Sequence, residues 1–244
     1  PERPEAGRED AVLRAAREIV SERPLAMVVD NVIPIGRGLG SSSAAAVAGA
    51  AAALWAVGRE PDPADLARVV AELDGHPDNA AASVYGGLVA VAGSGRVVGL
   101  ELHSSLRPVV AVPGHSLSTL EARTVLPDPL PRQVAVGALP RLVMLLEGLR
   151  SGRADLLGEA AGDQLHEAPR ARLHPKAAEL IAVARSGGAS HACWSGAGPA
   201  VLALAHPGHL SAVVAALEGA LDAGGRVLVP EVARPGLRRE VALA

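Results

Sequence analysis

Residues 33–58 read IPIGRGLGSSSAAAVAGAAAALWAVG. Gly36, Gly38 and Gly40 lead this stretch, and serines and a long run of small apolar residues follow them. Glycine permits positive φ angles and lets a ligand approach the backbone closely, while the start of a helix offers unpaired N–H groups and the positive end of the helix dipole. We therefore expect a loop, then a buried helix over residues 42–57, and phosphate binding where they join is one physically coherent interpretation.

This loop differs from the common phosphate-binding loops. A Walker A loop carries a lysine directly after its last glycine, and no lysine stands near Gly40. The glycine spacing also differs from G-x-G-x-x-G. A plain glycine turn that lets an alanine-rich helix pack closely, with a serine as its N-cap, would explain the same residues. The loop alone leaves both interpretations open.

Composition narrows the class of protein. The 244 residues suit one or two domains, and 49% are hydrophobic but 1% aromatic, so alanine, valine and leucine must fill the core. The net charge of -3 and the scarcity of aromatic residues give no support for nucleic-acid binding. No stretch reads as a membrane span. The single Cys193 excludes an internal disulfide and suits a reducing compartment, so we expect a cytoplasmic protein.

Hydrophobic periodicity predicts alternating helices and strands. The expected helices cover residues 10–20, 42–57, 64–73, 131–150, 154–172, 176–185 and 207–223. The expected strands cover residues 25–31, 88–92, 97–102 and 226–230, the segment RPVVAVPG, and two strands around a glycine turn in 191–205. On the 131–150 helix, an apolar face is expected to point inward: Leu142, Val143, Leu145, Leu146 and Leu149.

Two motifs resemble the GHMP kinase family. Its P-x-x-x-G-L-G-S-S-A-A signature is similar to the loop, with matches at Pro34, Gly38, Leu39, Gly40, Ser41 and Ser42; Ser43 stands where alanine is usual. The segment SGAGPAVLAL, residues 195–204, resembles the family's C-terminal glycine motif, which packs against the phosphate loop. The resemblance implies an α+β, two-lobed fold. Residues 1–104 would form the ATP-binding lobe, incomplete at its start, with a left-handed βαβ unit, and residues 105–244 a ferredoxin-like lobe.

Three further segments resemble the homoserine kinases within that family. They are GHPDNAAASVYGGLVA (75–90), STLEARTVLP (118–127) and DQLHEAPRARLHP (163–175), the last with Pro169 displaced by one and a tyrosine absent. The resemblance implies phosphorylation of the L-homoserine hydroxyl by ATP, with Mg²⁺, to give O-phospho-L-homoserine for threonine synthesis. Another GHMP small-alcohol kinase, and a truncated homologue that binds nucleotide without turnover, remain the alternatives.

The resemblance also implies the site residues. The nucleotide would contact the loop: Pro34, Ile35, Gly36, Arg37, Gly38, Leu39, Gly40, Ser41, Ser42 and Ser43. Mg²⁺ would contact Ser42 and either Glu72 or Asp74, between which spacing does not decide. Homoserine would contact six residues: His76, Asp78, Thr119, Arg123, Arg170 and Gly196. Asp78 and Asn79 would be catalytic, with Asp78 either removing the hydroxyl proton or orienting the hydroxyl.

Chemistry supports this set independently. A forked guanidinium suits the homoserine carboxylate, which makes Arg123 and Arg170 candidates. Phosphoryl transfer depends mainly on positioning and charge neutralisation, and Mg²⁺ takes oxygen ligands.

The family further implies a homodimer and an opening segment that no part of this sequence matches. We therefore expect either a chain incomplete at its start or a shortened homologue, whose activity would then be in question.

Overall fold

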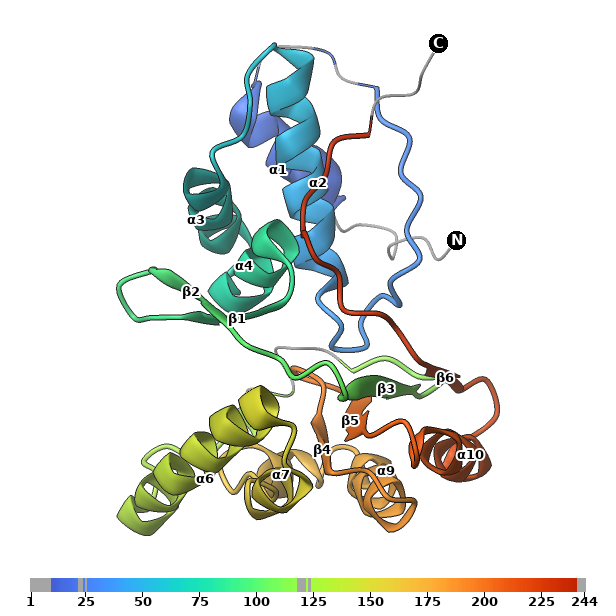
Figure 1. Cartoon of the computed structure of the whole chain (residues 1–244). Coiled ribbons are helices and arrows are strands. Elements are labelled where there is room, and N and C mark those ends of the chain that lie inside the picture. The colour runs from blue at the N-terminus through green and yellow to red at the C-terminus, as the bar shows by residue number, and fades with distance from the viewer. Residues whose placement is uncertain (1–9, 22–23, 25, 118–121, 123, 241–244) are drawn as a thin grey trace. The chain divides into compact units, whose positions relative to one another are not determined.

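The computed structural model describes residues 10–21, 24, 26–117, 122 and 124–240 (Figure 1). These residues form two compact units. The first unit takes in the chain up to Ile35, Gly40–Leu100 and the stretch from Val232 onward. The second unit takes in Gly36–Leu39 and Glu101–Glu231. Among the described helices, none combines the length and the hydropathy needed to span a bilayer.

The first unit is built from helices and one hairpin. Its elements are α1 (Ala11–Ile19), α2 (Ser41–Ala56), α3 (Pro63–Asp74), α4 (Pro77–Tyr85) and the antiparallel pair β1 (Leu88–Val91) and β2 (Val97–Leu100). The apolar helix predicted after the loop is α2, which runs beside α1 (Figure 1). A Cβ atom on Gly49 would collide with the Val12 carbonyl, so this glycine lets the two helices approach closely. A core of small residues is thereby packed without aromatic rings.

The strand predicted over residues 25–31 is wrong. The described residues of this stretch belong to no ladder, and Val28 is fully exposed and Val32 83% exposed. A β-strand exists only with a hydrogen-bonded neighbour, and the ladder that the described part of this unit contains joins β1 to β2. The described residues of this unit contain one antiparallel pair of strands and do not form the βαβ unit expected in this lobe.

The second unit contains a four-stranded antiparallel sheet in the order β4–β5–β3–β6. Its strands are β4 (His191–Trp194), β5 (Val201–Ala205), β3 (Arg107–Val112) and β6 (Arg226–Leu228). Helices α9 (Pro175–Ser186) and α10 (Leu210–Ala220) pack on one face of the sheet (Figure 1). Val109, Val201 and Leu217 are completely buried between these layers. This is the sheet with helices on one face that the ferredoxin-like prediction requires.

Two predictions for the helices of this unit are wrong. The single helix expected over 154–172 is two, α7 (Ala154–Glu159) and α8 (Glu167–Arg170). Gly162 has a positive φ of 85°, and the Asp163 carboxylate accepts the Leu165 N–H at 2.7 Å. A left-handed residue and a side chain that bonds the backbone both interrupt a helix.

The inward face predicted on α6 (Arg132–Ser151) is largely exposed. Leu142 and Val143 are 52% and 59% exposed, whereas Leu149 is buried. The buried end includes Gly148, where an added Cβ would lie 2.8 Å from Leu157 Cγ of α7. The C-terminal end of α6 is therefore packed against α7. The periodicity correctly gives an apolar face, but it does not show which surface covers the rest of that face.

The last described residues return to the first unit. Leu237 N–H donates to the Val84 carbonyl at 3.1 Å, and Gly87 N–H donates to the Ala233 carbonyl at 2.8 Å. The domain boundaries expected from the sequence, 1–104 and 105–244, stay a prediction. By contacts, the described residues divide at Leu100 and again at Val232.

Candidate functional site

The two glycine motifs meet in the second unit. Ser195 Oγ donates to the Gly38 carbonyl oxygen at 2.9 Å, and a Cβ on Gly196 would lie 3.0 Å from that same oxygen. Gly38 has a φ of 75°, and a Cβ there would overlap the Ser195 carbonyl oxygen. Glycine is therefore required by both backbone conformation and space, and the predicted packing of the motifs is confirmed.

The side chain of Arg37 anchors the same part of the loop. Its Nε donates to the Pro113 carbonyl at 3.1 Å, and its Nη2 donates to the Gly114 carbonyl at 2.9 Å. The Ala200 N–H donates to the Arg37 carbonyl, and Leu39 packs on a small cluster that includes Ala200. This half of the loop is thus fixed by backbone and side-chain bonds before any ligand arrives.

The start of α2 lies in the first unit and has no side-chain cap. Gly40 is the N-cap residue, with a φ of 72°, so the serine cap of the plain-turn interpretation is not formed. The first N–H groups of a helix have no intrahelical acceptor, and they combine with the helix dipole to attract anions. This end of α2 can therefore receive a phosphate group.

Asn31 shapes the entry to the loop, and the sequence did not single it out. Its Nδ2 donates to the Ile33 carbonyl at 3.0 Å and to Ser41 Oγ at 3.3 Å, while its Oδ1 accepts the Ile33 N–H. The signal available beforehand was a polar Asp30–Asn31 pair that ends an apolar run just before the loop.

Asp74 receives hydrogen bonds from two serines at the start of α2. Ser42 Oγ donates to one carboxylate oxygen at 2.6 Å, and Ser43 Oγ donates to the other. Burial raises the pKa of Asp74, but the two hydroxyl bonds and the nearby His76 outweigh it, so its pKa lies below the ordinary value of 3.8. His76 Nδ1 lies 3.3 Å from Asp74 Oδ2. The carboxylate thus stays ionised at neutral pH.

The structure separates the two acids proposed for Mg²⁺. Asp74 lies beside Ser42, whereas Glu72 is exposed and pairs with Arg68 at 3.1 Å. A hydroxyl and a carboxylate are hard oxygen donors, which fit Mg²⁺. In the described part of the chain, no three or more His, Cys, Asp or Glu side chains cluster to hold a metal. A cation here would therefore complete its shell with phosphate oxygens or water.

Asp78 and Asn79 lie in the first turn of α4. The Asn79 carboxamide lies beside Gly40, where an added Cβ would be 3.6 Å from Asn79 Oδ1. Asp78 is exposed to solvent. The first unit thus gathers Asn79, His76 and Asp74 near the start of α2, while Glu72 points elsewhere.

Arg170 is buried in the second unit and binds backbone carbonyls. Its Nη1 donates to the Gly196 carbonyl at 2.9 Å, and its Nε donates to the Ala122 carbonyl at 3.4 Å. Arg170 therefore braces the second glycine motif. Thr119 and Arg123, also predicted to contact substrate, lie outside the described residues.

An aromatic cluster beside the second glycine motif also escaped prediction; His174 and Trp194 in it are buried, whereas His115 is exposed. His115 Nε2 lies 3.1 Å from His174 Nδ1, and the His174 ring stands edge-on to Trp194. Burial and the neighbouring His115 lower the pKa of His174. A Cβ on Gly198 would overlap the Trp194 ring. This cluster therefore packs against the second glycine motif, and the local sequence pattern does not predict it.

Comparison with known proteins agrees with this architecture. Residues 10–87 match the model of the GHMP kinases N terminal domain, and residues 145–223 match that of the GHMP kinases C terminal domain. Homoserine kinase of Moorella thermoacetica is 40% identical over 205 residues, which cover 81% of this chain and 69% of the relative. Homoserine kinase of Thermus thermophilus is 41% identical over 207 residues, which cover 84% and 71%.

Solved structures give the same result. The crystal structure of homoserine kinase from Cytophaga hutchinsonii superposes with a TM-score of 0.82 at 26% identity, covering 96% of this chain and 79% of that one. The putative homoserine kinase from Listeria monocytogenes gives 0.74 at 30% identity, covering 93% and 78%. The relatives named above are homoserine kinases or, for the Listeria protein, a putative one. The chain therefore belongs to the GHMP kinase family.

Proposed function

We propose that this chain is an ATP-dependent homoserine kinase, which transfers the γ-phosphoryl group of ATP to the hydroxyl of L-homoserine. The product would be O-phospho-L-homoserine, an intermediate of threonine synthesis. The observation that carries the proposal is the uncapped start of α2, where a left-handed Gly40 precedes serine hydroxyls backed by the Asp74 carboxylate. The homoserine kinases at about 40% identity support the choice of acceptor.

The glycine loop would bind the nucleotide phosphates through backbone N–H groups and the dipole of α2. Gly38 and Arg37 are already held by Ser195, Pro113 and Gly114, so little ordering remains to oppose binding. Ser42 and Asp74 would hold Mg²⁺, which neutralises phosphate charge when it is bound.

The residues proposed to contact the acceptor follow from the resemblance to the homoserine kinases. Asp78 would either remove the proton of the homoserine hydroxyl or orient that hydroxyl, with Asn79 and His76 beside it. Arg123 and Thr119 would contact the amino acid directly. Arg170 would bind the homoserine carboxylate, and its bond to the Gly196 carbonyl keeps it beside a second residue proposed to contact the substrate.

The test is to incubate the purified chain with ATP, Mg²⁺ and L-homoserine and to follow the product by ³¹P NMR. We expect a phosphomonoester signal that depends on homoserine and is not produced with mevalonate or a sugar. Asp74→Asn should lower kcat strongly, whereas the matched Glu72→Gln should retain activity. Preference for another alcohol would reject homoserine as the acceptor. Nucleotide binding without turnover on any alcohol would favour the non-catalytic alternative.

We also propose that the protein is cytoplasmic and homodimeric. Apolar residues spaced three and four apart are exposed on α6: Val136, Leu139, Leu142, Val143 and Leu146. In an antiparallel pairing of two α6 helices that sets Val136 opposite Val143, Arg132 of one copy comes opposite Glu147 of the other. Apolar contact at the centre and opposite charges at the edge suit a second copy of this chain.

Light scattering after size exclusion tests this interface. Leu139→Glu should convert a dimer to a monomer, whereas Val98→Glu, on an exposed apolar residue of β2, should not change the mass. A monomeric parent protein, or a dimer that survives Leu139→Glu, would reject α6 as the interface.

A further inference from the structure

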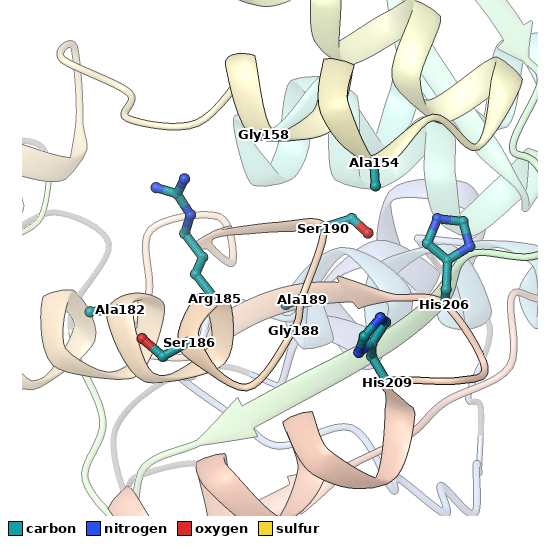
Figure 2. Close-up of a pocket in the computed structure, with 10 residues that line it drawn as sticks. All are labelled: Ala154, Gly158, Ala182, Arg185, Ser186, Gly188, Ala189, Ser190, His206 and His209. Atoms are coloured by element: carbon teal, nitrogen blue, oxygen red, sulfur yellow. The ribbon is translucent and has the colours of Figure 1, made fainter.

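A pocket lies in the second unit, and none of its lining residues belongs to the glycine loop. It has a volume of about 670 Å³ and lies where α7, the end of α9 and the start of α10 come together (Figure 2). Its ten lining residues include one arginine, two histidines and two serines, and none is acidic. A pocket of this size can hold a small metabolite, and its lining favours negative charge.

Arg185 is the fixed positive charge of this pocket. Its side chain is exposed, and in Figure 2 it extends from the end of α9 away from the neighbouring Ser186. Among the described residues, no side chain forms a hydrogen bond or ion pair with it. Glu167 and His191 lie close enough to interact electrostatically, but His191 Nδ1 is already 3.0 Å from the Leu157 carbonyl. The guanidinium therefore keeps its forked donors available for an oxyanion.

His206 and His209 approach from the loop between β5 and α10 (Figure 2). The His209 ring packs on the backbone of Gly188, where φ is 101° and an added Cβ would lie 2.7 Å from His209 Nδ1. His209 is also the N-cap residue of α10 and makes no side-chain cap bond, so the first N–H groups of this 11-residue helix have no side-chain acceptor. The packing on Gly188 therefore fixes the position of the His209 ring.

We propose that this pocket binds the phosphate or carboxylate group of a small anionic metabolite, at a site separate from the nucleotide loop. Arginine forms paired charge-assisted hydrogen bonds with either group, and imidazole N–H and serine hydroxyl groups add donors. Ser190 also lines the pocket, with its hydroxyl toward the gap that His206 borders (Figure 2). The volume exceeds that of a bare oxyanion, so an organic group can accompany the anionic head. This inference is independent of which alcohol the kinase phosphorylates.

The experiment titrates the full chain with inorganic phosphate and, separately, with succinate. The ring signals of His206 and His209 are followed by NMR, first without nucleotide and then with saturating ATP and Mg²⁺ to occupy the nucleotide loop. Arg185→Gln should weaken binding by about tenfold, because a charge-assisted hydrogen bond is worth about 1.4 kcal/mol or more. Arg96→Gln, at an exposed arginine of the β1–β2 turn, is the matched control and should bind like the parent protein.

Saturable shifts with phosphate identify a phosphorylated ligand, and shifts with succinate identify a carboxylated one; either result supports the site. The proposal is overturned if neither anion moves the two histidine signals. It is equally overturned if Arg185→Gln and Arg96→Gln bind alike, or if the shifts vanish when ATP is added, because phosphate would then be binding at the nucleotide loop.

Discussion

Replacing Gly38 with alanine tests the geometry on which the loop depends. A φ of 75° costs an L-residue about 1–2 kcal/mol. The new Cβ would also lie 2.0 Å from the Ser195 carbonyl oxygen and 2.7 Å from the Gly198 nitrogen. Both are backbone atoms, which cannot rotate away, so the overlap adds a penalty of about 1–3 kcal/mol. The variant should therefore lose about 2–5 kcal/mol in its free energy of unfolding.

The control is Gly162→Ala, in the same unit. Gly162 has a φ of 85°, but no atom lies within 4 Å of its added Cβ, so this variant bears the conformational cost alone. Urea denaturation compares the free energies of unfolding, and calorimetric titration compares ATP affinity. Gly38→Ala should be the less stable variant and the one with weakened ATP binding. Equal stability of the two variants would refute the argument that the glycine motifs are packed too closely for a Cβ atom.

Three other predictions concern single side chains. Arg170→Met should lower the free energy of unfolding by about 1.5–3 kcal/mol in urea denaturation, because the carbonyls that Arg170 binds lose a charged donor. An unchanged urea midpoint would contradict a role for Arg170 in holding the second glycine motif. Burial raises the pKa of Cys193 to about 12, so Ellman's reagent at pH 8 should label this thiol only after denaturation, and rapid labelling of the folded protein would contradict its burial. Because the pKa of Asp74 is lower in the folded state, its contribution to stability is present above pH 3.8 and is lost as the pH falls through the folded-state pKa. Stability measured down to pH 2 should therefore fall more steeply in the parent protein than in Asp74→Asn, and parallel curves would contradict the shift.

Features encoded locally were predictable. The loop and α2 follow from glycines beside an unbroken apolar run, and the β4–β5 pair follows from two apolar segments around a glycine turn. In each case the deciding contacts join residues close in the sequence. The family's motifs then supplied the order in which these parts occur.

Features that depend on distant partners were not predictable. The 25–31 segment has the composition of a strand but no neighbour in the described chain, and α6 has an apolar face whose covering surface its own sequence cannot specify. Arg170 illustrates the same limit within the site. Its charge suggested a substrate carboxylate, which stays a prediction, whereas its hydrogen bonds to the carbonyls of Gly196 and Ala122 could not be foreseen from the residue type. A side chain's type indicates what it can bind, and the fold decides which partner is within reach.

The mutual dependence of the two glycine motifs explains why they occur together. The Gly38 carbonyl has its place because Ser195 donates to it, although 157 positions separate these residues in the sequence. Gly196 must lack a side chain because Gly38 approaches it, and Gly198 must lack one because the Trp194 ring fills that space. Each motif therefore leaves no space for a larger side chain at the glycines of the other. A loop held in this way presents its remaining backbone groups in one fixed conformation, which is what positioning a phosphate chain for transfer requires.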